Sequence, residues 1–201
     1  MKKFNLQSVR PLYQGFFTLN EYLVSHEKYD GSESAVLKRE IFDRGDAAGL
    51  LAYDAIKNKV ILVEQFRAGV CRESDSPWVT EIIAGIIEKD QSPEDVAIRE
   101  SMEEAGAQIK HIEHICDFWP SPGGCNEQFF IYLGLVDSDQ VQPFGGLDNE
   151  AEDIKVLTVD LSDIPNMLAN GEIKSGGAIV ALQWLLLNLE AKREGWIALQ
   201  S

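Results

Sequence analysis

Cysteine is scarce in this sequence, and long apolar runs are missing. Its 3 cysteines, Cys71, Cys116 and Cys125, form no Cys-x-x-Cys pair, which favours a reducing, cytoplasmic location over a disulfide framework. No secretory signal is recognisable and no uncharged stretch reaches the ~20 apolar residues of a membrane span. His111 and His114 lack the spacing of a zinc site, so we expect them to be solvated polar positions.

Basic residues are also few. The 18 Lys and Arg stand against 33 Asp and Glu, which gives a formal net charge of −15. A field of that sign repels phosphate backbones and anionic lipid, so partners among nucleic acids and membranes are not expected. A length of 201 residues with 45% apolar and 25% charged residues indicates one globular domain, or one domain with a small appendage.

The composition changes near residue 45. Residues 1–45 contain alternating strand patterns at 17–24 and 35–42, with a turn signal at 29–32 between them. We therefore predict a small antiparallel N-terminal β lobe over residues 1–45. It is too thin to hold its own core and should pack on the main domain, residues 46–201, or on a second chain.

The main domain mixes strands with a few helices. A hairpin is expected over 47–53 and 60–65, because a polar turn separates two apolar runs. Further strands are expected at residues 78–83, 114–119, 128–135 and 153–159, and helices at residues 92–105, 161–169 and 177–192. This order is not a regular βαβ series, so it predicts an α+β or α/β sandwich with a mixed sheet.

The helix expected over residues 92–105 has clear end signals. Ser92 suits the N-cap, Pro93 suits the first helical position, and Asp95 is placed to complete a capping box. Gly106 suits the C-terminal cap. The ends of this helix are therefore predicted by local chemistry alone.

Three carboxylates share one face of this helix. At ~100° per residue, Glu100, Glu103 and Glu104 point one way, whereas Ile98 and Met102 point the opposite way. Like charges at this spacing repel each other. A solvated acidic face is one reading, and a site for a hard cation such as Mg²⁺ or Mn²⁺ is the other.

A wider pattern favours the cation site. Gly85 stands before Gln91, and nine residues from Arg99 read Arg-Glu-Ser-Met-Glu-Glu-Ala-Gly-Ala. This resembles the Nudix box: Gly, five residues, Glu, seven residues, then Arg-Glu-apolar-x-Glu-Glu-x-Gly-apolar. Gln91 replaces the first Glu and Ser101 replaces an apolar residue. We expect Gln91 to accept a hydrogen bond from Arg99, so that Gly85, Gln91, Arg99 and Gly106 support the box.

The resemblance extends over nearly the full length. The matching segments resemble the bacterial ADP-ribose pyrophosphatase branch of the Nudix family. They are residues 12–17, 39–45, 64–67, 121–124, 150–154 and 180–185. The resemblance implies an α/β/α sandwich with a mixed sheet, an N-terminal β lobe, and a homodimer that exchanges these lobes. It also implies Mg²⁺-dependent hydrolysis of the pyrophosphate of ADP-ribose to AMP and ribose 5-phosphate.

The resemblance assigns roles to individual residues. Glu150 would be the general base, on a loop that closes over the site, and Glu103 would act both in catalysis and as a ligand. The implied metal ligands are the Ala84 carbonyl and the carboxylates of Glu100, Glu103, Glu104 and Glu152, with Mg²⁺ as the cofactor and Mn²⁺ as a substitute. Without the resemblance, the acidic stretch around Glu150 favours a solvated loop acid at this position.

Recognition of the nucleotide falls to other residues. Arg67 or Arg39 could reach a phosphate or stack on adenine, and one of Phe16 and Phe17 could stack on the base. A surface ion pair or a core ring would explain the same residues. The resemblance also places Ser121, Gly123 and Glu127 near the terminal ribose.

Two other functions stay open. A hydrolase of another nucleoside-diphosphate sugar, such as GDP-mannose, would use the same machinery. A Nudix-fold ligand sensor without turnover is disfavoured, because such proteins usually lose carboxylates that this sequence keeps. A bound cation would reverse the local charge, so the net charge of −15 excludes no metal-chelated phosphate ester.

Overall fold

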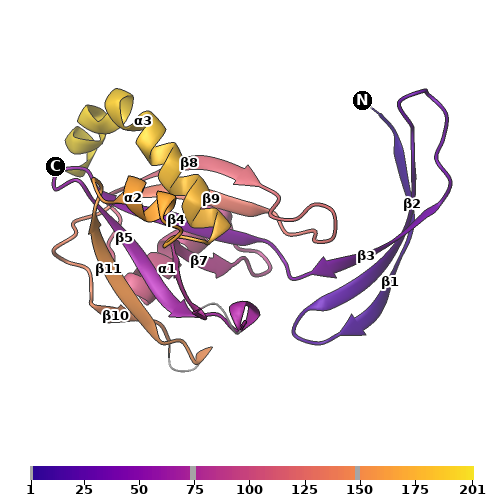
Figure 1. Ribbon diagram of the computed structural model, residues 1–201, viewed down its shortest axis with the longest axis horizontal. Helices are drawn as coiled ribbons and strands as arrows, with labels where there is room; N and C mark the ends of the chain where they lie inside the picture. The colour runs from indigo at the N-terminus through magenta and orange to yellow at the C-terminus, as the bar shows by residue number, and fades with distance from the viewer. Residues whose placement is uncertain (1, 73–75, 148–149) are drawn as a thin grey trace. The chain divides into compact units, whose positions relative to one another are not determined.

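The chain divides into two units (Figure 1). The computed structural model describes residues 2–72, 76–147 and 150–201. Unit 1 comprises Met1–Asp46 and Trp119–Gln128, and unit 2 comprises Ala47–Phe118 and Phe129–Ser201. A loop from the middle of the sequence thus belongs to unit 1. The division into folding domains at residue 45 stays a prediction.

Unit 1 is an antiparallel sheet. Within the described residues its order is β1 (Phe4–Gln14), β2 (Thr18–His26) and β3 (Leu37–Asp43). Strands β2 and β3 confirm the two predicted strands. The sequence does not predict β1, because its residues are all exposed and no buried face imposes an apolar period on them.

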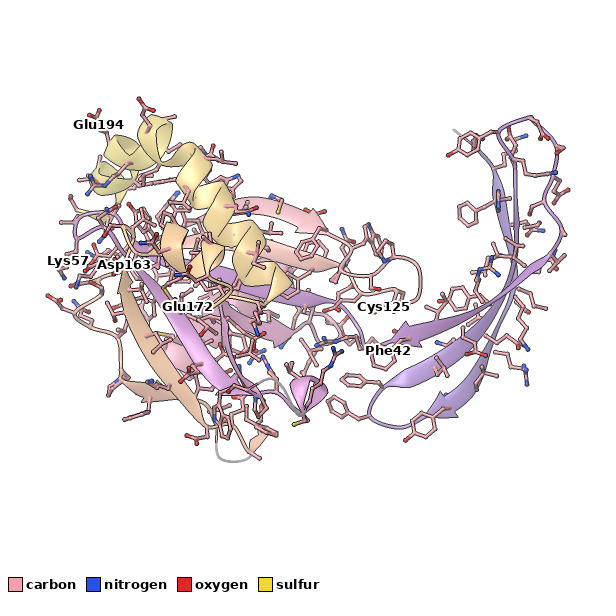
Figure 2. All side chains as sticks on the ribbon, in the orientation of Figure 1. Phe42, Lys57, Cys125, Asp163, Glu172 and Glu194 are labelled. Atoms are coloured by element: carbon pink, nitrogen blue, oxygen red, sulfur yellow. The ribbon has the colours of Figure 1, made fainter. Side chains whose placement is uncertain are left out.

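The loop of unit 1 is joined to β3 through the main chain. Phe42 N–H donates to the Gly124 carbonyl over 2.8 Å, and Asn126 N–H donates to the Phe42 carbonyl over 3.3 Å. Phe42 and Cys125, labelled in Figure 2, form a parallel bridge there. The loop therefore extends the β3 side of unit 1.

Unit 2 is built on a mixed sheet. Its strands are β4 (Ala47–Asp54), β5 (Lys59–Phe66), β6 (Trp78–Glu81), β7 (Ile83–Ile86), β8 (His111–Phe118), β9 (Phe129–Leu135), β10 (Phe144–Gly145) and β11 (Ile154–Asp160). In the described residues the order is β10-β11-β5-β4-β9-β8, with β6 on β5 and β7 on β4. Only β4 and β9 pair in parallel in this part of the chain.

The predicted hairpin of β4 and β5 is confirmed. The single strand predicted over residues 78–83 is wrong in one respect, because it is two strands. β6 pairs with β5, whereas β7 pairs with β4. The chain therefore changes partner near Ile82, and this change brings β7 alongside the central strand.

Helices cover both faces of the sheet. They are η1 (Ala68–Val70), α1 (Pro93–Ala105), α2 (Ile164–Ala169) and α3 (Gly176–Gln200). Successive side chains of β4 alternate, so Leu51 and Tyr53 join the α3 core while Leu50 and Ala52 join the α1 core. These side chains are fully buried. The α/β/α sandwich expected from the resemblance is confirmed (Figure 1).

Helix α3 extends well beyond its predicted end at residue 192. It buries Ala181, Leu182, Leu185 and Trp196 against its own sheet, whereas Leu187 is 85% exposed. Much of the apolar surface of α3 is thus buried within unit 2. No helix in the described part of the chain is long and apolar enough to cross a membrane.

Candidate functional site

Both ends of α1 form as predicted. The Ser92 hydroxyl accepts a hydrogen bond from Asp95 N–H over 3.1 Å and donates to the Asp95 carboxylate over 2.6 Å. Gly106 ends the helix in the left-handed conformation, with φ of 61°. A residue with a side chain is rarely stable in that conformation, which explains the glycine.

The orientation of α1 is opposite to that of an ordinary amphipathic helix. Glu100 and Glu104 are buried, with relative exposures of 8% and 1%, whereas Ile98 and Met102 are 39% and 52% exposed. The carboxylate face packs on β4 and β7, where the small residue Ala97 permits close approach. The reading of a solvated acidic face is therefore wrong.

Strand β7 makes room for these carboxylates. A Cβ atom on Gly85 would lie 1.7 Å from Glu100 Oε1, so any side chain at position 85 would displace the Glu100 carboxylate. Ala84 N–H donates a hydrogen bond to Glu104 Oε2 over 3.2 Å. Strand β7 therefore positions two of the three helical carboxylates, and this accounts for the glycine of the box. The role of the Ala84 carbonyl stays a prediction.

Arg99 lies among these carboxylates. Its guanidinium pairs with Glu100 over 2.9 Å and with Glu103 over 2.5 Å. The expected hydrogen bond between Arg99 and Gln91 is wrong for the described residues, because Gln91 Oε1 accepts from Glu88 N–H instead, over 3.1 Å. An amide carries no charge, so it competes poorly with two carboxylates for a guanidinium.

The burial of these acids changes their titration. Burial raises the pKa of Glu100 to about 7, against the attraction of Arg99. Burial also raises the pKa of Glu104 well above its ordinary value, and the charges of Glu100 and Glu152 raise it further, while Arg67 opposes them. The site therefore holds more carboxylates than Arg99 and Arg67 can neutralise. Such an excess of carboxylate oxygens is the set of donors that a hard divalent cation requires.

Among the described residues, no group of three His, Cys, Asp or Glu side chains is already arranged to coordinate a metal ion. Glu100 and Glu103 are turned toward Arg99. An entering cation would have to displace this guanidinium from the carboxylates. Glu100, Glu103, Glu104 and the nearby Glu152 are the residues that fit such a cation. His114 pairs with Asp117 over 2.9 Å instead.

The two loop glutamates differ in placement. Glu152 is half-buried, and Leu147 N–H donates to its carboxylate over 3.4 Å. Glu152 is close enough to raise the pKa of the buried Glu104, after burial itself and the Glu100 charge. Glu150 is exposed, and its N–H donates to the Leu147 carbonyl over 3.0 Å. The structure thus brings Glu152 to the helical carboxylates and leaves Glu150 at the surface of the loop.

Arg67 has a partner that the sequence analysis missed. It follows β5, and its Nε donates to Glu81 Oε2 on the neighbouring β6 over 2.6 Å. Glu81 is mostly buried, so it holds the exposed guanidinium in place. A carboxylate on the strand next to an arginine could have indicated this pair, but only once the pairing of β5 with β6 was known.

The two phenylalanines of unit 1 lie in a bend between β1 and β2. The premise that they point opposite ways along a strand is wrong, because their rings contact each other, with centroids 4.7 Å apart. Phe16 is 88% exposed, whereas Phe17 packs on Phe42 with centroids 5.2 Å apart. Of the two, Phe16 has the ring free to contact another molecule.

The remaining predicted recognition residues also lie in unit 1. Arg39 is exposed on β3 and donates to the Lys38 carbonyl over 2.8 Å. Ser121 and Gly123 lie in the predicted turn, where Ser121 O accepts from the N–H groups of Gly124 and Cys125.

Glu127, which follows this turn, is buried. Burial raises the pKa of its carboxyl, against the attraction of Arg44, whose guanidinium lies 3.6 Å away. Arg44 also lies over the Phe17 ring, 5.7 Å from its centroid. Arg44 is not among the residues predicted from the sequence. It joins two of the predicted recognition residues, Phe17 and Glu127, in one cluster of unit 1.

Comparison with known proteins identifies the family. Residues 43–178 match the NUDIX domain. The chain is 43% identical to an ADP-ribose pyrophosphatase of Haemophilus influenzae and 40% identical to one of Escherichia coli K12. Each match spans 92% of this chain, and 87% and 88% of the respective relatives.

More distant relatives agree. A GDP-mannose pyrophosphatase of Escherichia coli UTI89 is 31% identical over 88% of this chain and 92% of its own. The crystal structure of an ADP compounds hydrolase superposes with a TM-score of 0.71 at 17% identity, covering 94% of this chain and 96% of that one, which supports the fold. With two buried glutamates on α1 and a family match over more than half its length, the chain belongs to the Nudix family.

Proposed function

We propose that this protein hydrolyses the pyrophosphate bond of ADP-ribose, giving AMP and ribose 5-phosphate. The observation that carries the proposal is the identity of 43% and 40%, over 92% of the chain, to two proteins named ADP-ribose pyrophosphatase. The geometry of α1 supports it, since all three box carboxylates are present on a face held against the sheet. A sensor without turnover would have no need to bury two of them.

Mg²⁺, or Mn²⁺ in its place, would neutralise the diphosphate and lower the pKa of a bound water. The residues that would hold the cation are Glu100, Glu103, Glu104 and Glu152, with the Ala84 carbonyl beside them. Because α1 and β7 are rigid elements, the oxygens of Ala84, Glu100, Glu103 and Glu104 would stand in a fixed frame, whereas Glu152 would reach the cation from its loop.

The other residues of the chain orient groups or carry protons. Arg99 holds the carboxylates of Glu100 and Glu103 on the same side of α1. Arg67, fixed by Glu81, is placed to attract a phosphate. Glu150 is our proposed general base, since an exposed loop carboxylate can accept a proton from water and pass it to solvent.

The metal assignment is tested with Glu104→Gln. Glutamine keeps the size of the side chain and can still accept the hydrogen bond from Ala84 N–H, so the fold should persist. We expect kcat to fall by about 10² or more with Mg²⁺ present, because one buried ligand is lost. The matched control is Glu94→Gln, an exposed position in the first turn of the same helix, which should leave kcat unchanged. Near-normal turnover in Glu104→Gln would overturn the assignment.

The substrate is tested by kcat/KM with Mg²⁺ over ADP-ribose, ADP-glucose, GDP-mannose, NADH, FAD and diadenosine polyphosphates. ADP-ribose should have the highest value. GDP-mannose is the second candidate, because a relative named for that substrate is 31% identical to this chain. A higher kcat/KM for GDP-mannose would replace the proposed substrate and leave the mechanism unchanged.

We also propose that the protein is a homodimer that exchanges its N-terminal lobes. All residues of β1 are exposed, among them the apolar side chains Phe4, Val9 and Tyr13 at 75%, 48% and 66%. A strand with such a surface favours burial against another chain. Light scattering should give twice the mass of the chain. A monomer mass at every concentration would exclude the dimer.

A cytoplasmic location stays a prediction. It rests on Cys71, Cys116 and Cys125, which are free of disulfides in the described part of the chain.

A further inference from the structure

The carboxyl end of α1 leaves carbonyl groups that the helix itself cannot satisfy. Two of its terminal hydrogen bonds are local, from Gly106 N–H to Met102 O over 3.1 Å and from Ala107 N–H to Ser101 O over 2.9 Å. The carbonyl oxygens of Glu103 and Ala105 have no such local donor among the described residues. Their partners come from a segment about 40 residues further along the chain.

That segment, Gln142–Leu147, supplies the missing donors; we call it the docking segment. Gln142 N–H donates to the Ala105 carbonyl and Gly146 N–H donates to the Glu103 carbonyl, each over 2.9 Å. The docking segment contains β10, and the two donors flank this edge strand, so the strand is held at the end of α1 from both sides. One of the two accepting carbonyls belongs to Glu103 itself.

Gly145 lies where the two backbones approach most closely. A Cβ atom at this position would lie 1.9 Å from the Glu104 carbonyl oxygen, 2.4 Å from its carbonyl carbon and 3.1 Å from the Glu103 oxygen. These are backbone atoms of a buried helix, so no change of rotamer can relieve the overlap. Any residue with a side chain at position 145 must therefore move the docking segment away from α1.

The docking segment is also linked to Glu152. Leu147 N–H donates to the Glu152 carboxylate over 3.4 Å, and Glu152 N–H donates to the Leu147 carbonyl over 3.3 Å. Gly145 pairs with Ile154 in the β10–β11 ladder. A Cβ atom on Gly146 would lie only 2.8 Å from Glu152 Cβ, so the backbone at Gly146 lies close to the Glu152 side chain. Movement of the docking segment thus moves Glu152.

We propose that Gly145 is a positioning residue, which sets the place of Glu152 relative to the glutamates of α1 by letting the docking segment bond to the helix end. This inference rests on the proposed function for the role of those glutamates. It assigns no contact with substrate to Gly145. The glycine acts by having no side chain where two main chains meet.

The test is Gly145→Ala, with Gly195→Ala as the matched control. A Cβ atom on Gly195, in α3, meets no atom within 4 Å, so its substitution should leave kcat unchanged. For Gly145→Ala we expect kcat for ADP-ribose to fall about 10- to 100-fold while KM stays within about 3-fold, because displacement by about 1 Å has that effect on a reacting geometry. A folded Gly145→Ala variant with kcat within about 2-fold of wild type would overturn the proposal.

A double-mutant cycle separates positioning from general damage. If Gly145 acts through Glu152, then Gly145→Ala should cost less than about 3-fold in kcat once Glu152→Gln is present. Full additivity would show that the two residues act independently and would refute the link. Gly146→Ala, whose Cβ would press on Glu152 instead of on the helix and whose φ of 95° also strains a side chain, should reproduce the loss by displacing the same segment, and it replaces Gly145→Ala if that variant does not fold.

Binding of Mn²⁺, measured by calorimetry without substrate, is independent of turnover. We expect the Kd for Mn²⁺ to rise about 10-fold in Gly145→Ala and to stay unchanged in Gly195→Ala. A wild-type protein that binds Mn²⁺ but hydrolyses no ADP-ribose would reject the proposed function and leave this comparison intact. An unchanged Kd in Gly145→Ala, with the protein folded, would reject the positioning role.

Discussion

Replacing Glu100 by glutamine should stabilise the metal-free protein at high pH. The Glu100 carboxyl is buried under β7, which raises its pKa from the ordinary 4.5 to about 7. The native state therefore holds this proton more tightly than the unfolded chain does. Stability is then highest below pH 4.5 and declines as the pH rises toward 7, where the native carboxyl ionises. The difference between the pKa of 4.5 in the unfolded chain and about 7 in the native state corresponds to a loss of ~3 kcal/mol in the free energy of unfolding at high pH.

The variant Glu100→Gln mimics the protonated acid at every pH. In urea denaturation with a chelator present, its free energy of unfolding at pH 8 should exceed that of wild type by about 3 kcal/mol, and the gain should shrink to below about 1 kcal/mol at pH 5. Glu94→Gln, on the exposed first turn of α1, is the control and should change stability by less than about 0.5 kcal/mol. Equal or lower stability of Glu100→Gln at pH 8 would refute the reasoning that burial sets this pKa.

Two further predictions concern Gln200 and Gly85. Gln200 is buried, accepts from Ala55 N–H and donates to Asp54 and to the Val136 carbonyl, so Gln200→Ala should cost about 2–4 kcal/mol in urea denaturation; a loss below about 0.5 kcal/mol would contradict this. The three atoms nearest to a Cβ on Gly85 all belong to the Glu100 side chain, so Gly85→Ala should lower kcat at least about 10-fold by displacing that carboxylate; unchanged kcat would contradict the close fit.

Local chemistry accounts for what the sequence predicts correctly. The caps at Ser92 and Gly106 depend on residues within one turn, so the ends of α1 follow from a short stretch of sequence. The hairpin of β4 and β5 follows in the same local way from a polar turn between two apolar runs. The predicted fold rests on patterns of this kind.

The parts that the sequence does not predict depend on distant residues. Ile98 and Met102 form an apolar face of α1, yet the structure buries the opposite face, because the glutamates pack on β4 and β7, which lie far from the helix in the sequence. The close approach of Gly145 to Glu104 joins positions about 40 residues apart, so no local period reveals it.

The way in which the two units share the chain limits how they can be separated. Trp119–Gln128 belongs to unit 1 but is inserted between β8 and β9 of unit 2. Ala47, Phe118 and Phe129, the residues at which the chain enters or leaves unit 2, lie opposite one another in adjacent strands, since Phe129 pairs with both others. Removing residues 1–46 would therefore leave Trp119–Gln128, a part of unit 1, as a loop between β8 and β9 without the rest of its unit. To remove all of unit 1, this loop must also be replaced by a short turn from Phe118 to Phe129.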